Sequence, residues 1–568
     1  MTDFDFVIVG SGISGGWVAK ELSERGFKVA VLERGRDIDP ATDYTDFQEP
    51  WDFENLGQKT KQDEVDHPIQ SEVYAFHPYT RQFWVNDNDY PYETPEGQSF
   101  KWRRGHHKGG RSIMWGRQSY RMSETDFEAN RKDGHGVDWP VRYNDIAPWY
   151  DHVERFAGIS GSEEGLEILP DGVFQPPFEL NCVEQEFKNR IETEYDGRRS
   201  VIPARVANLT QPTEEQMALG RGMCQSRNHC HRGCSFGAYF SSNSSTLPAA
   251  ERTGNCTMLY DTVVLSVEYD DDGGRAQSVK TLNTKTGEHR TISFRAIFLN
   301  ASTIATATIL LNSVSEAFPT GLANRSGHLG RNLIDHVMGG GAFGIFPGYE
   351  DKYYYGRKPA GFYIPRFRNH TEDAPDFVRG YGFQGIASRL GWGARSAQPG
   401  LGEDFKNGLR TPGPWVVYCA GFGEILPNYD NHVRLHPNRT DKDGLPVPIL
   451  DAKIGENEEK LIAQMSKDSV EMLQTAGCIG ARLLEFGGNE GSYTFGNAIH
   501  EMGTARMGHD PSTSVLNKWN QAHEVPNLFI TDGSFMASGA CQNPSLSYMA
   551  FSARAADHAA ELMRENVI

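Results

Sequence analysis

Two residues near the C-terminus have side chains that suit proton transfer and hydrogen bonding to a hydroxyl group. His500 lies in the run IHEMGTARMG that begins at Ile499, and Asn543 lies in the run QNPS that begins at Gln542. An imidazole titrates near neutral pH and can take a hydroxyl proton, while an amide can hold and orient the same hydroxyl. Plainer roles are also open, because a histidine at a turn can bond to the backbone and an Asn-Pro pair can cap a helix.

Three cysteines fall within eleven residues, in the run MCQSRNHCHRGC that begins at Met223. Arginines surround them, and nearby positive charge favours the thiolate, which is the form that ligates iron–sulfur clusters. Zinc held by the three thiolates and His229 or His231 is one alternative, and a disulfide or a set of free thiols is another. The candidate metal ligands are Cys224, Cys230 and Cys234.

The start of the chain predicts a dinucleotide-binding unit. Residues 6–9 and 28–32 predict buried strands, and a helical pattern between them ends near Gly26. The run GSGISG links the first strand to the helix. Its glycines permit a tight turn, close approach of a pyrophosphate to the helix N-terminus, and close helix–strand packing. An acid at the end of the second strand can accept hydrogen bonds from a ribose. The strand–helix–strand unit does not distinguish NAD from FAD. At this part of the cofactor we expect Gly10, Gly12, Ile13, Ser14, Gly15, Glu33 and Arg34.

The composition describes a folded, acidic chain of 568 residues. Lys plus Arg number 56 and Asp plus Glu number 75, so the net charge of −19 argues against nucleic acid or an anionic membrane surface as the main partner. The length suits three or four average domains or one large interleaved fold. No apolar run approaches the roughly 20 residues that span a bilayer, and the acidic start lacks the basic leader of a secretory signal.

The C-terminal part carries a family resemblance. Residues 525–534 predict a strand that ends in Asp-Gly, and a helix rich in small residues is expected from about residue 545 to residue 563. Together with the runs GHHKGGRS and GRNLIDH, this arrangement resembles the glucose–methanol–choline (GMC) family of FAD-dependent oxidoreductases. That family pairs a histidine in an H-x-x-G-T-x-x-M run with a later histidine or asparagine. The resemblance, which covers nearly the whole chain, therefore implies His500 as the base and Asn543 as its partner.

The resemblance also implies the fold and the cofactor. We expect an α/β (α+β overall) fold in which a Rossmann-like FAD-binding domain is interleaved with an antiparallel-sheet substrate domain. FAD is expected to be non-covalent, because Met114 precedes Trp115 at a place where some relatives carry a flavin-bonded histidine. The FAD domain is expected to comprise residues 1–50, 98–150, 216–340 and 488–568. Residues 51–97 are expected to form a lid or a merely solvated excursion. The substrate domain is expected to comprise residues 151–215 and 341–487. Further cofactor contacts are expected at Gly109, Gly110, Ser112, Trp115, Val264, Ala301, Asp532, Gly533, Asn543, Pro544 and Ser545.

Within the family, the chain resembles bacterial sugar dehydrogenases, especially glucoside 3-dehydrogenases. This likeness implies oxidation of a ring hydroxyl of a sugar or glycoside, at C3, to a ketone. It also implies a [3Fe-4S] cluster on the three cysteines, although Gln225 replaces an additional cysteine of that group. Electrons would pass to a cytochrome, a quinone or a dye. A small subunit with an export signal would carry the enzyme to the periplasm; a cytoplasmic location is the alternative.

Other functions compete with this one. An oxidase that uses oxygen and a gluconate- or fructose-type dehydrogenase share the expected fold, whereas a non-redox flavin lyase and a non-catalytic binding protein belong to other classes. For the substrate we expect a strand over residues 378–384, in which Gly380, Gly382 and Gln384 share one face. The two glycines would leave room for a sugar beside Gln384, with Tyr381 available for stacking. Alternatively, the glycines only mark a strand packed against other parts of the protein.

Overall fold

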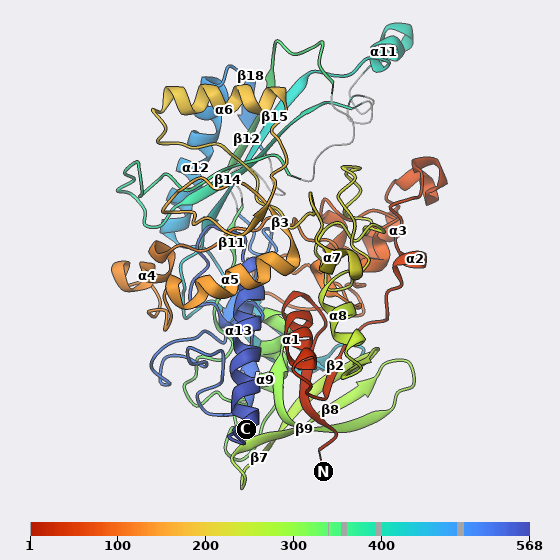
Figure 1. The fold of residues 1–568 in the computed structure, drawn as a ribbon, viewed down its shortest axis with the longest axis vertical. Coiled ribbons are helices and arrows are strands. Elements are labelled where there is room, and N and C mark those ends of the chain that lie inside the picture. Colours follow the sequence, from red (N-terminus) through yellow and green to blue (C-terminus); the bar gives the residue numbers. More distant parts are fainter. Residues whose placement is uncertain (1, 339, 354–359, 392–394, 396–399, 485–492) are drawn as a thin grey trace.

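The computed structural model describes residues 2–338, 340–353, 360–391, 395, 400–484 and 493–568. Two large sheets lie one above the other along the long axis, and both termini lie at the end of the nucleotide-binding sheet (Figure 1). In the described ranges no helix combines the length and the apolar character needed to cross a membrane.

The lower sheet is the expected nucleotide-binding sheet. Its parallel strands follow the order β6-β2-β1-β9 and β20 also pairs with β9, while β8 and β7 extend the other edge in antiparallel fashion. The side chains of residues 6–9 of β1 and of all four residues of β2 are buried on both faces, as parallel sheets require. These strands are β1 (Phe4–Val9), β2 (Val29–Leu32), β6 (Cys256–Leu259), β7 (Thr262–Asp270), β8 (Arg275–Asn283), β9 (His289–Leu299) and β20 (Leu528–Ile530).

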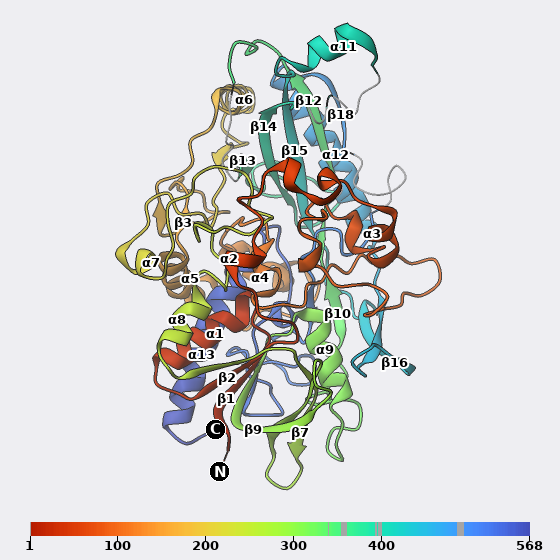
Figure 2. The same cartoon turned by 90° about the vertical axis from the view of Figure 1, so that its right-hand side faces the viewer.

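Helices from distant parts of the sequence cover this sheet. Helix α1 (Ile13–Glu24) returns from β1 and packs against α13 (Ser545–Arg564), which in turn contacts α5 (Tyr143–Ala157). Helix α9 (Thr303–Asn312) follows β9 and packs against β7 (Figure 2). The predicted strand–helix–strand unit and the C-terminal helix are therefore confirmed.

The upper sheet is antiparallel, with order β18-β12-β15-β14-β13-β5, and the short β11 also pairs with β15. Helices α6 (Cys182–Glu194) and α12 (Glu456–Thr475) pack against it (Figure 1). Its strands are β5 (Ile202–Pro203), β11 (His336–Val337), β12 (Gly341–Phe346), β13 (Phe362–Ile364), β14 (Tyr381–Arg389), β15 (Trp415–Glu424) and β18 (Ile479–Leu483).

A third sheet joins the two parts, in the order β17-β16-β10-β19. Its strands are β10 (Arg331–Ile334), β16 (His432–Thr440), β17 (Pro446–Asp451) and β19 (Met502–Thr504). The hairpin of β16 and β17 was expected in the substrate domain, but it pairs with β10 and lies beside the nucleotide sheet. The domain boundaries stay a prediction, with this hairpin as the main departure from them.

The segment 51–97 consists of short helical turns and loops. Part of it packs on η5 (Gly110–Ile113), through a cluster that includes Phe76, Phe83 and Ile113. The smaller elements of the chain are α2 (Pro40–Asp43), α3 (Lys61–Asp66), α4 (Glu124–Asp133), β3 (Ile159–Ser160), β4 (Phe174–Gln175), α7 (Glu214–Ala218), α8 (Thr246–Arg252) and α11 (Gly402–Leu409).

Candidate active site

A deep cavity opens where the parallel strands end. Strands β1, β2, β9 and β20 run in the same direction, so their carboxyl ends meet at one edge of the sheet, which is where ligands bind in open α/β sheets. The segment 51–97 contributes Val73, Tyr74, Ala75, Trp84 and Pro91 to the wall. Part of the excursion therefore forms a wall of the cavity, and the lid stays a prediction.

Most of the residues expected at the cofactor line this cavity. Gly15 and Gly109 do not: Gly15 faces the strand before it, and the backbone N–H of Gly109 donates to Ser11 Oγ. The expected residues that do line it are Gly10, Gly12, Ile13, Ser14, Glu33, Arg34, Gly110, Ser112, Trp115, Val264, Ala301, Asp532, Gly533, Asn543, Pro544 and Ser545.

The catalytic candidates meet at the cavity wall. His500 Nε2 lies 3.3 Å from Asn543 Nδ2, and Asn543 Oδ1 accepts a 2.6 Å hydrogen bond from Gln384 Nε2 on β14. This hydrogen bond to Gln384 holds the Asn543 amide beside the imidazole. Burial lowers the pKa of His500 well below its usual value, and the positive charge of Arg111 lowers it further. The imidazole is therefore neutral near pH 7 and can accept a proton.

The backbone around His500 is held in an unusual conformation. Ile499 has φ +63° and Thr504 has φ +75°, values that β-branched residues rarely adopt and that cost about 1–3 kcal/mol each. The Asp335 carboxylate holds this loop, because Oδ1 accepts the backbone N–H of His500 at 3.0 Å and Oδ2 accepts that of Gly496 at 2.9 Å. Strain retained beside a reactive side chain is typical of functional sites.

Comparison with known proteins agrees with this geometry. Two profiles described as GMC oxidoreductase match the chain, one over residues 4–338 and the other over residues 427–552. The chain belongs to the GMC oxidoreductase family.

Named relatives of this GMC chain are alcohol- and sugar-oxidising enzymes. It is 28% identical to 2-methyl-1,2-propanediol dehydrogenase of Mycolicibacterium austroafricanum, over 98% of this chain and 94% of that protein. It is 27% identical to the fructose dehydrogenase large subunit of Gluconobacter japonicus, over 97% of each chain. A solved FAD-dependent oxidoreductase from Chaetomium thermophilum shares the fold with a TM-score of 0.61 at 14% identity, covering 99% of this chain and 100% of that one. The chain is thus an FAD-dependent oxidoreductase that acts on CH–OH groups.

The glycines of the GMC fingerprint fit a dinucleotide. Gly10 has φ +97°, and a Cβ on Gly15 would lie 1.9 Å from the carbonyl oxygen of Gly10, so helix and strand touch there. A Cβ on Gly12 would meet no protein atom within 4 Å, because it would point into the cavity. That open space at the start of α1 is where a pyrophosphate needs to approach the backbone.

Two of the helices that begin at the cavity, α1 and α13, leave their N-terminal N–H groups free of capping side chains. Gly12 is the N-cap of α1 and Pro544 is the N-cap of α13. Neither helix has an acidic residue in its first turn. The two helix dipoles therefore favour negative charge at two places along the cavity, as an FAD with its pyrophosphate and its reduced ring would provide.

Buried donors without partners also point to a missing ligand. In the described part of the chain, Arg103 Nη1, Arg104 Nε, His106 Nδ1 and the Tyr548 hydroxyl are buried and unpaired, and all four residues line the cavity. Leaving such groups unpaired costs about 1–3 kcal/mol each, so a bound polar ligand would satisfy them. The side chains of this cavity therefore fit FAD.

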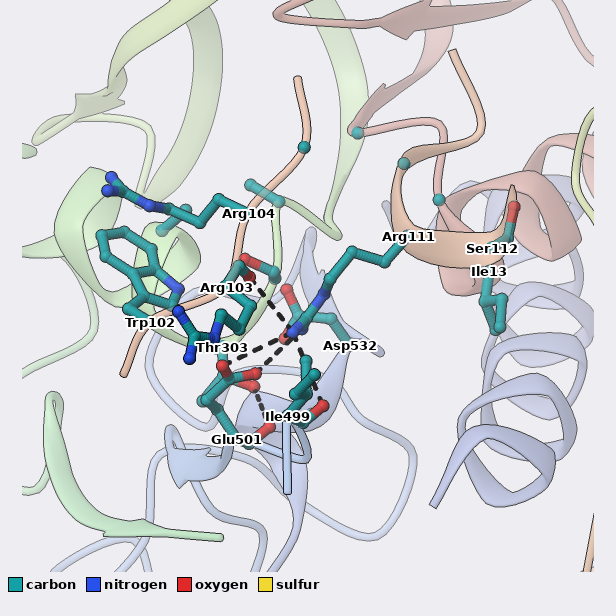
Figure 3. Close-up of a pocket in the computed structure, with 18 of the residues that line it drawn as sticks. Ile13, Trp102, Arg103, Arg104, Arg111, Ser112, Thr303, Ile499, Glu501 and Asp532 are labelled. Atoms are coloured by element: carbon teal, nitrogen blue, oxygen red, sulfur yellow. Dashed lines mark hydrogen bonds and ion pairs between the residues drawn. The ribbon is translucent and has the colours of Figure 1, made fainter. Parts of the chain in front are cut away.

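Several residues of the site were not assigned a role from the sequence. Arg111 reaches from its loop to Glu501, with Nη2 2.9 Å from Oε2, and Thr303 Oγ1 donates to the Glu501 carbonyl at 2.6 Å (Figure 3). Arg34, expected at the cofactor, also binds Asp441 at 2.6 Å and Asp443 at 2.7 Å on the hairpin between β16 and β17. Their partners come from distant segments, so no local pattern could have indicated these pairs.

His336 is another residue that the sequence left without a role, although it lies in the GRNLIDH run. It is fully buried, and its Nδ1 lies 2.9 Å from His500 Nδ1. Burial lowers the pKa of His336, with Glu424 opposing the shift. Burial raises the pKa of the adjacent Asp335 to about 7, and the charge of Glu501 adds to this.

One expected substrate contact is wrong. Tyr381 is fully buried and donates to Asp468 of α12, because alternation along β14 places it on the face opposite Gln384. The glycines beside it leave no room for a ligand either. A Cβ on Gly380 would meet the Arg366 side chain, and one on Gly382 would meet the Tyr363 hydroxyl. Gln384 alone of this set lines the cavity.

The three clustered cysteines surround a separate small pocket. Cys224, Cys230 and Cys234 are partly buried free thiols that line it together. Burial raises the pKa of Cys224 and of Cys234, which corrects the expectation that nearby arginines favour thiolates. Over the described ranges, no set of three or more His, Cys, Asp or Glu side chains is arranged to hold a metal ion.

The arginines of this run are engaged elsewhere. Arg221 donates to the carbonyls of Phe156, Ala157 and Gly237, and Arg227 pairs with Asp46. The guanidinium of Arg232 lies over aromatic rings of the segment 51–97. Arg227 and Arg232 therefore contact groups other than the thiols, whereas Arg221 still interacts electrostatically with Cys234.

Proposed function

We propose that this enzyme is a dehydrogenase that oxidises a ring hydroxyl of a sugar or glycoside, at C3, to a ketone. The observation that carries the proposal is the meeting of a neutral His500 with a fixed Asn543 amide at the wall of the cavity that fits FAD. The fructose dehydrogenase large subunit among the relatives supports a sugar, while the diol dehydrogenase supports a smaller alcohol.

In the proposed reaction the alcohol loses a proton to the protein and a hydride to the cofactor. FAD, when bound, supplies the hydride acceptor. His500 Nε2 takes the hydroxyl proton, and Asn543 Nδ2 donates to the hydroxyl oxygen and holds it against the base. The free N-terminus of α13 lies at the same wall, where its dipole stabilises negative charge.

We also propose that FAD is attached non-covalently. Trp115 lines the cavity, its Nε1 donates to the Phe240 carbonyl at 2.8 Å, and Met114 stands directly before it. Neither residue offers a nucleophile for a flavin methyl group. Acid precipitation should therefore release all the yellow colour, whereas colour that stays in the pellet would demonstrate a covalent bond.

For the electrons that leave, we propose a [3Fe-4S] cluster on Cys224, Cys230 and Cys234. The support is that three free thiols line one pocket, and cysteine thiolates are the ligands that hold iron–sulfur clusters. The acceptor would be a cytochrome or quinone, and the relative named as a large subunit supports a small partner subunit. Export to the periplasm with that partner is part of the same proposal. Iron and sulfide analysis of anaerobically prepared protein would show zinc or no metal if the cluster proposal is wrong.

Anaerobic bleaching of the flavin tests the central proposal. The holoenzyme is mixed with sugars, glycosides and small diols, and the absorbance of oxidised flavin is followed in the wild type, in His500→Ala and in the control His509→Asn, which alters an exposed histidine. Bleaching by a sugar in the wild type and the control, slowed about 10²–10⁴-fold in His500→Ala, is expected. No bleaching with any alcohol would refute it. Rapid re-oxidation by air with hydrogen peroxide would favour the oxidase.

A further inference from the structure

The two buried histidines of the site are linked in a way that determines where their protons lie. His336 Nε2 lies 2.9 Å from the carbonyl oxygen of Ala540 and 3.3 Å from that of Gly539. A carbonyl only accepts, so Nε2 of His336 must carry the hydrogen. Rotating the ring by half a turn would place carbon atoms against both carbonyls and against His500.

The state of His500 follows from that of His336. Burial keeps His336 neutral, so its Nδ1 has a lone pair and can only accept. His500 Nδ1 lies 2.9 Å from it, in rings that are nearly perpendicular at 89°, and must therefore carry the hydrogen of that contact. This leaves His500 Nε2 without a hydrogen on the side of Asn543 and the cavity.

We propose that His336 is a positioning residue that holds His500 in the Nδ1–H tautomer, so that Nε2 is the free base of the reaction. The inference rests on the proposed function for its catalytic meaning, but the tautomer itself does not. Because the free histidine side chain favours neither nitrogen strongly, a neighbour that accepts only at Nδ1 decides which one is bare.

The surrounding backbone keeps this contact in place. Asp335 Oδ1 accepts the backbone N–H groups of both histidines, at 2.8 Å from His336 and 3.0 Å from His500. Tyr493 donates to the His336 carbonyl at 2.6 Å. The charged groups that face the pair are Asp335 and Glu501 from the neighbouring loops, Glu424 of β15 and Arg111 of the glycine-rich loop.

When His500 takes the hydroxyl proton it becomes an imidazolium, and His336 Nδ1 still accepts from its Nδ1–H. Loss of that acceptor should therefore act twice. It should let the resting imidazole adopt the inactive Nε2–H tautomer, and it should make the protonated form less stable, since a hydrogen bond from a charged donor would be missing.

Two variants separate this role from a merely structural one. His336→Asn places an amide oxygen near the former Nδ1 and keeps an acceptor, whereas His336→Leu has a similar volume and no acceptor. The rate of anaerobic flavin reduction should fall at least about 10-fold in the leucine variant, with its acid limb moved about one pH unit lower or more. The asparagine variant should stay within a few-fold of the wild type, as should the control His509→Asn. Equal losses in both His336 variants would overturn the proposal.

The tautomer of His500 can also be measured directly, without an activity assay. In holoenzyme labelled with ring-¹⁵N histidine, and with His500 assigned by its own substitution, Nδ1 should be protonated and Nε2 bare at pH 7.5. His336→Leu should shift the population toward Nε2–H. A wild-type His500 that carries its hydrogen on Nε2 would refute the inference, even if the leucine variant did not fold. A bare Nε2 in a protein that oxidises no alcohol would uphold the tautomer and refute only the proposed function.

Discussion

Gly12 and Gly15 offer a matched pair of substitutions, because the same added methyl group meets different surroundings. On Gly15 it would lie 1.9 Å from a backbone oxygen, so the start of α1 must move by about 1 Å, and overpacking of this kind costs about 1–3 kcal/mol. On Gly12 it would meet no protein atom within 4 Å, and φ −66° suits any residue. Gly12→Ala should therefore leave the apoprotein within about 1 kcal/mol of the wild type, the small cost of alanine at an N-cap.

In contrast to its small effect on stability, Gly12→Ala should weaken FAD binding strongly. The methyl group would occupy the space that a pyrophosphate needs, and loss of one charge-assisted hydrogen bond of about 1.5–3 kcal/mol weakens binding about 10- to 100-fold. Urea unfolding of the apoprotein and titration with FAD, followed by flavin fluorescence, measure the two quantities separately. Unchanged FAD affinity in Gly12→Ala, or destabilisation equal to that of Gly15→Ala, would refute this account of the glycine loop.

Three further predictions concern the site and its support. Because burial lowers the pKa of His500, the base stays neutral at pH values below the ordinary pKa of imidazole. The rate of flavin reduction should therefore fall on acidification with a midpoint below about pH 6.5, and a midpoint above that value would contradict the shift. Gln384→Leu should lower that rate about 3- to 10-fold by freeing the Asn543 amide, with stability within about 1 kcal/mol by urea unfolding. Arg379→Met leaves the buried Glu424 without its 2.9 Å partner, so the free energy of unfolding in urea should fall by about 3–5 kcal/mol. The double variant with Arg379→Met and Glu424→Gln should recover most of that loss. No recovery would show that the pair is not the cause.

The parts of the site that sequence reasoning predicted are those fixed by local geometry. The glycine run, the strands beside it and the acid at the end of the second strand lie within one strand–helix–strand unit, so spacing along the chain determines their placement. The start of α13 after Asn543 was also predictable, because Pro544 cannot continue a helix on its N-terminal side. His500 and Asn543 needed the family resemblance, since nothing in their spacing requires them to meet.

The parts that were missed depend on long-range pairing. His336 reaches His500 because β11 pairs with β15 of the upper sheet, and the hairpin of β16 and β17 crosses to Arg34 because it pairs with β10. The error at Tyr381 had a local remedy, since a strict period of two along the strand already places it on the face opposite Gln384. The arginines beside the cysteines lie close to them in sequence, but their guanidinium groups bind carbonyls, a carboxylate or aromatic rings instead.

The contacts of the base with both sheets have a consequence for specificity. Asn543 belongs to the segment that starts α13 of the nucleotide-binding part, but its amide is oriented by Gln384 on β14 of the upper sheet. His336 is the first residue of β11, which pairs with β15 of that sheet, and its Nε2 contacts the carbonyl oxygen of Ala540. A change in β14 or β15 that reshapes the substrate space therefore also moves the groups that orient the amide and the imidazole. Substrate preference and the rate of proton removal should consequently change together in this enzyme, because one set of strands determines both.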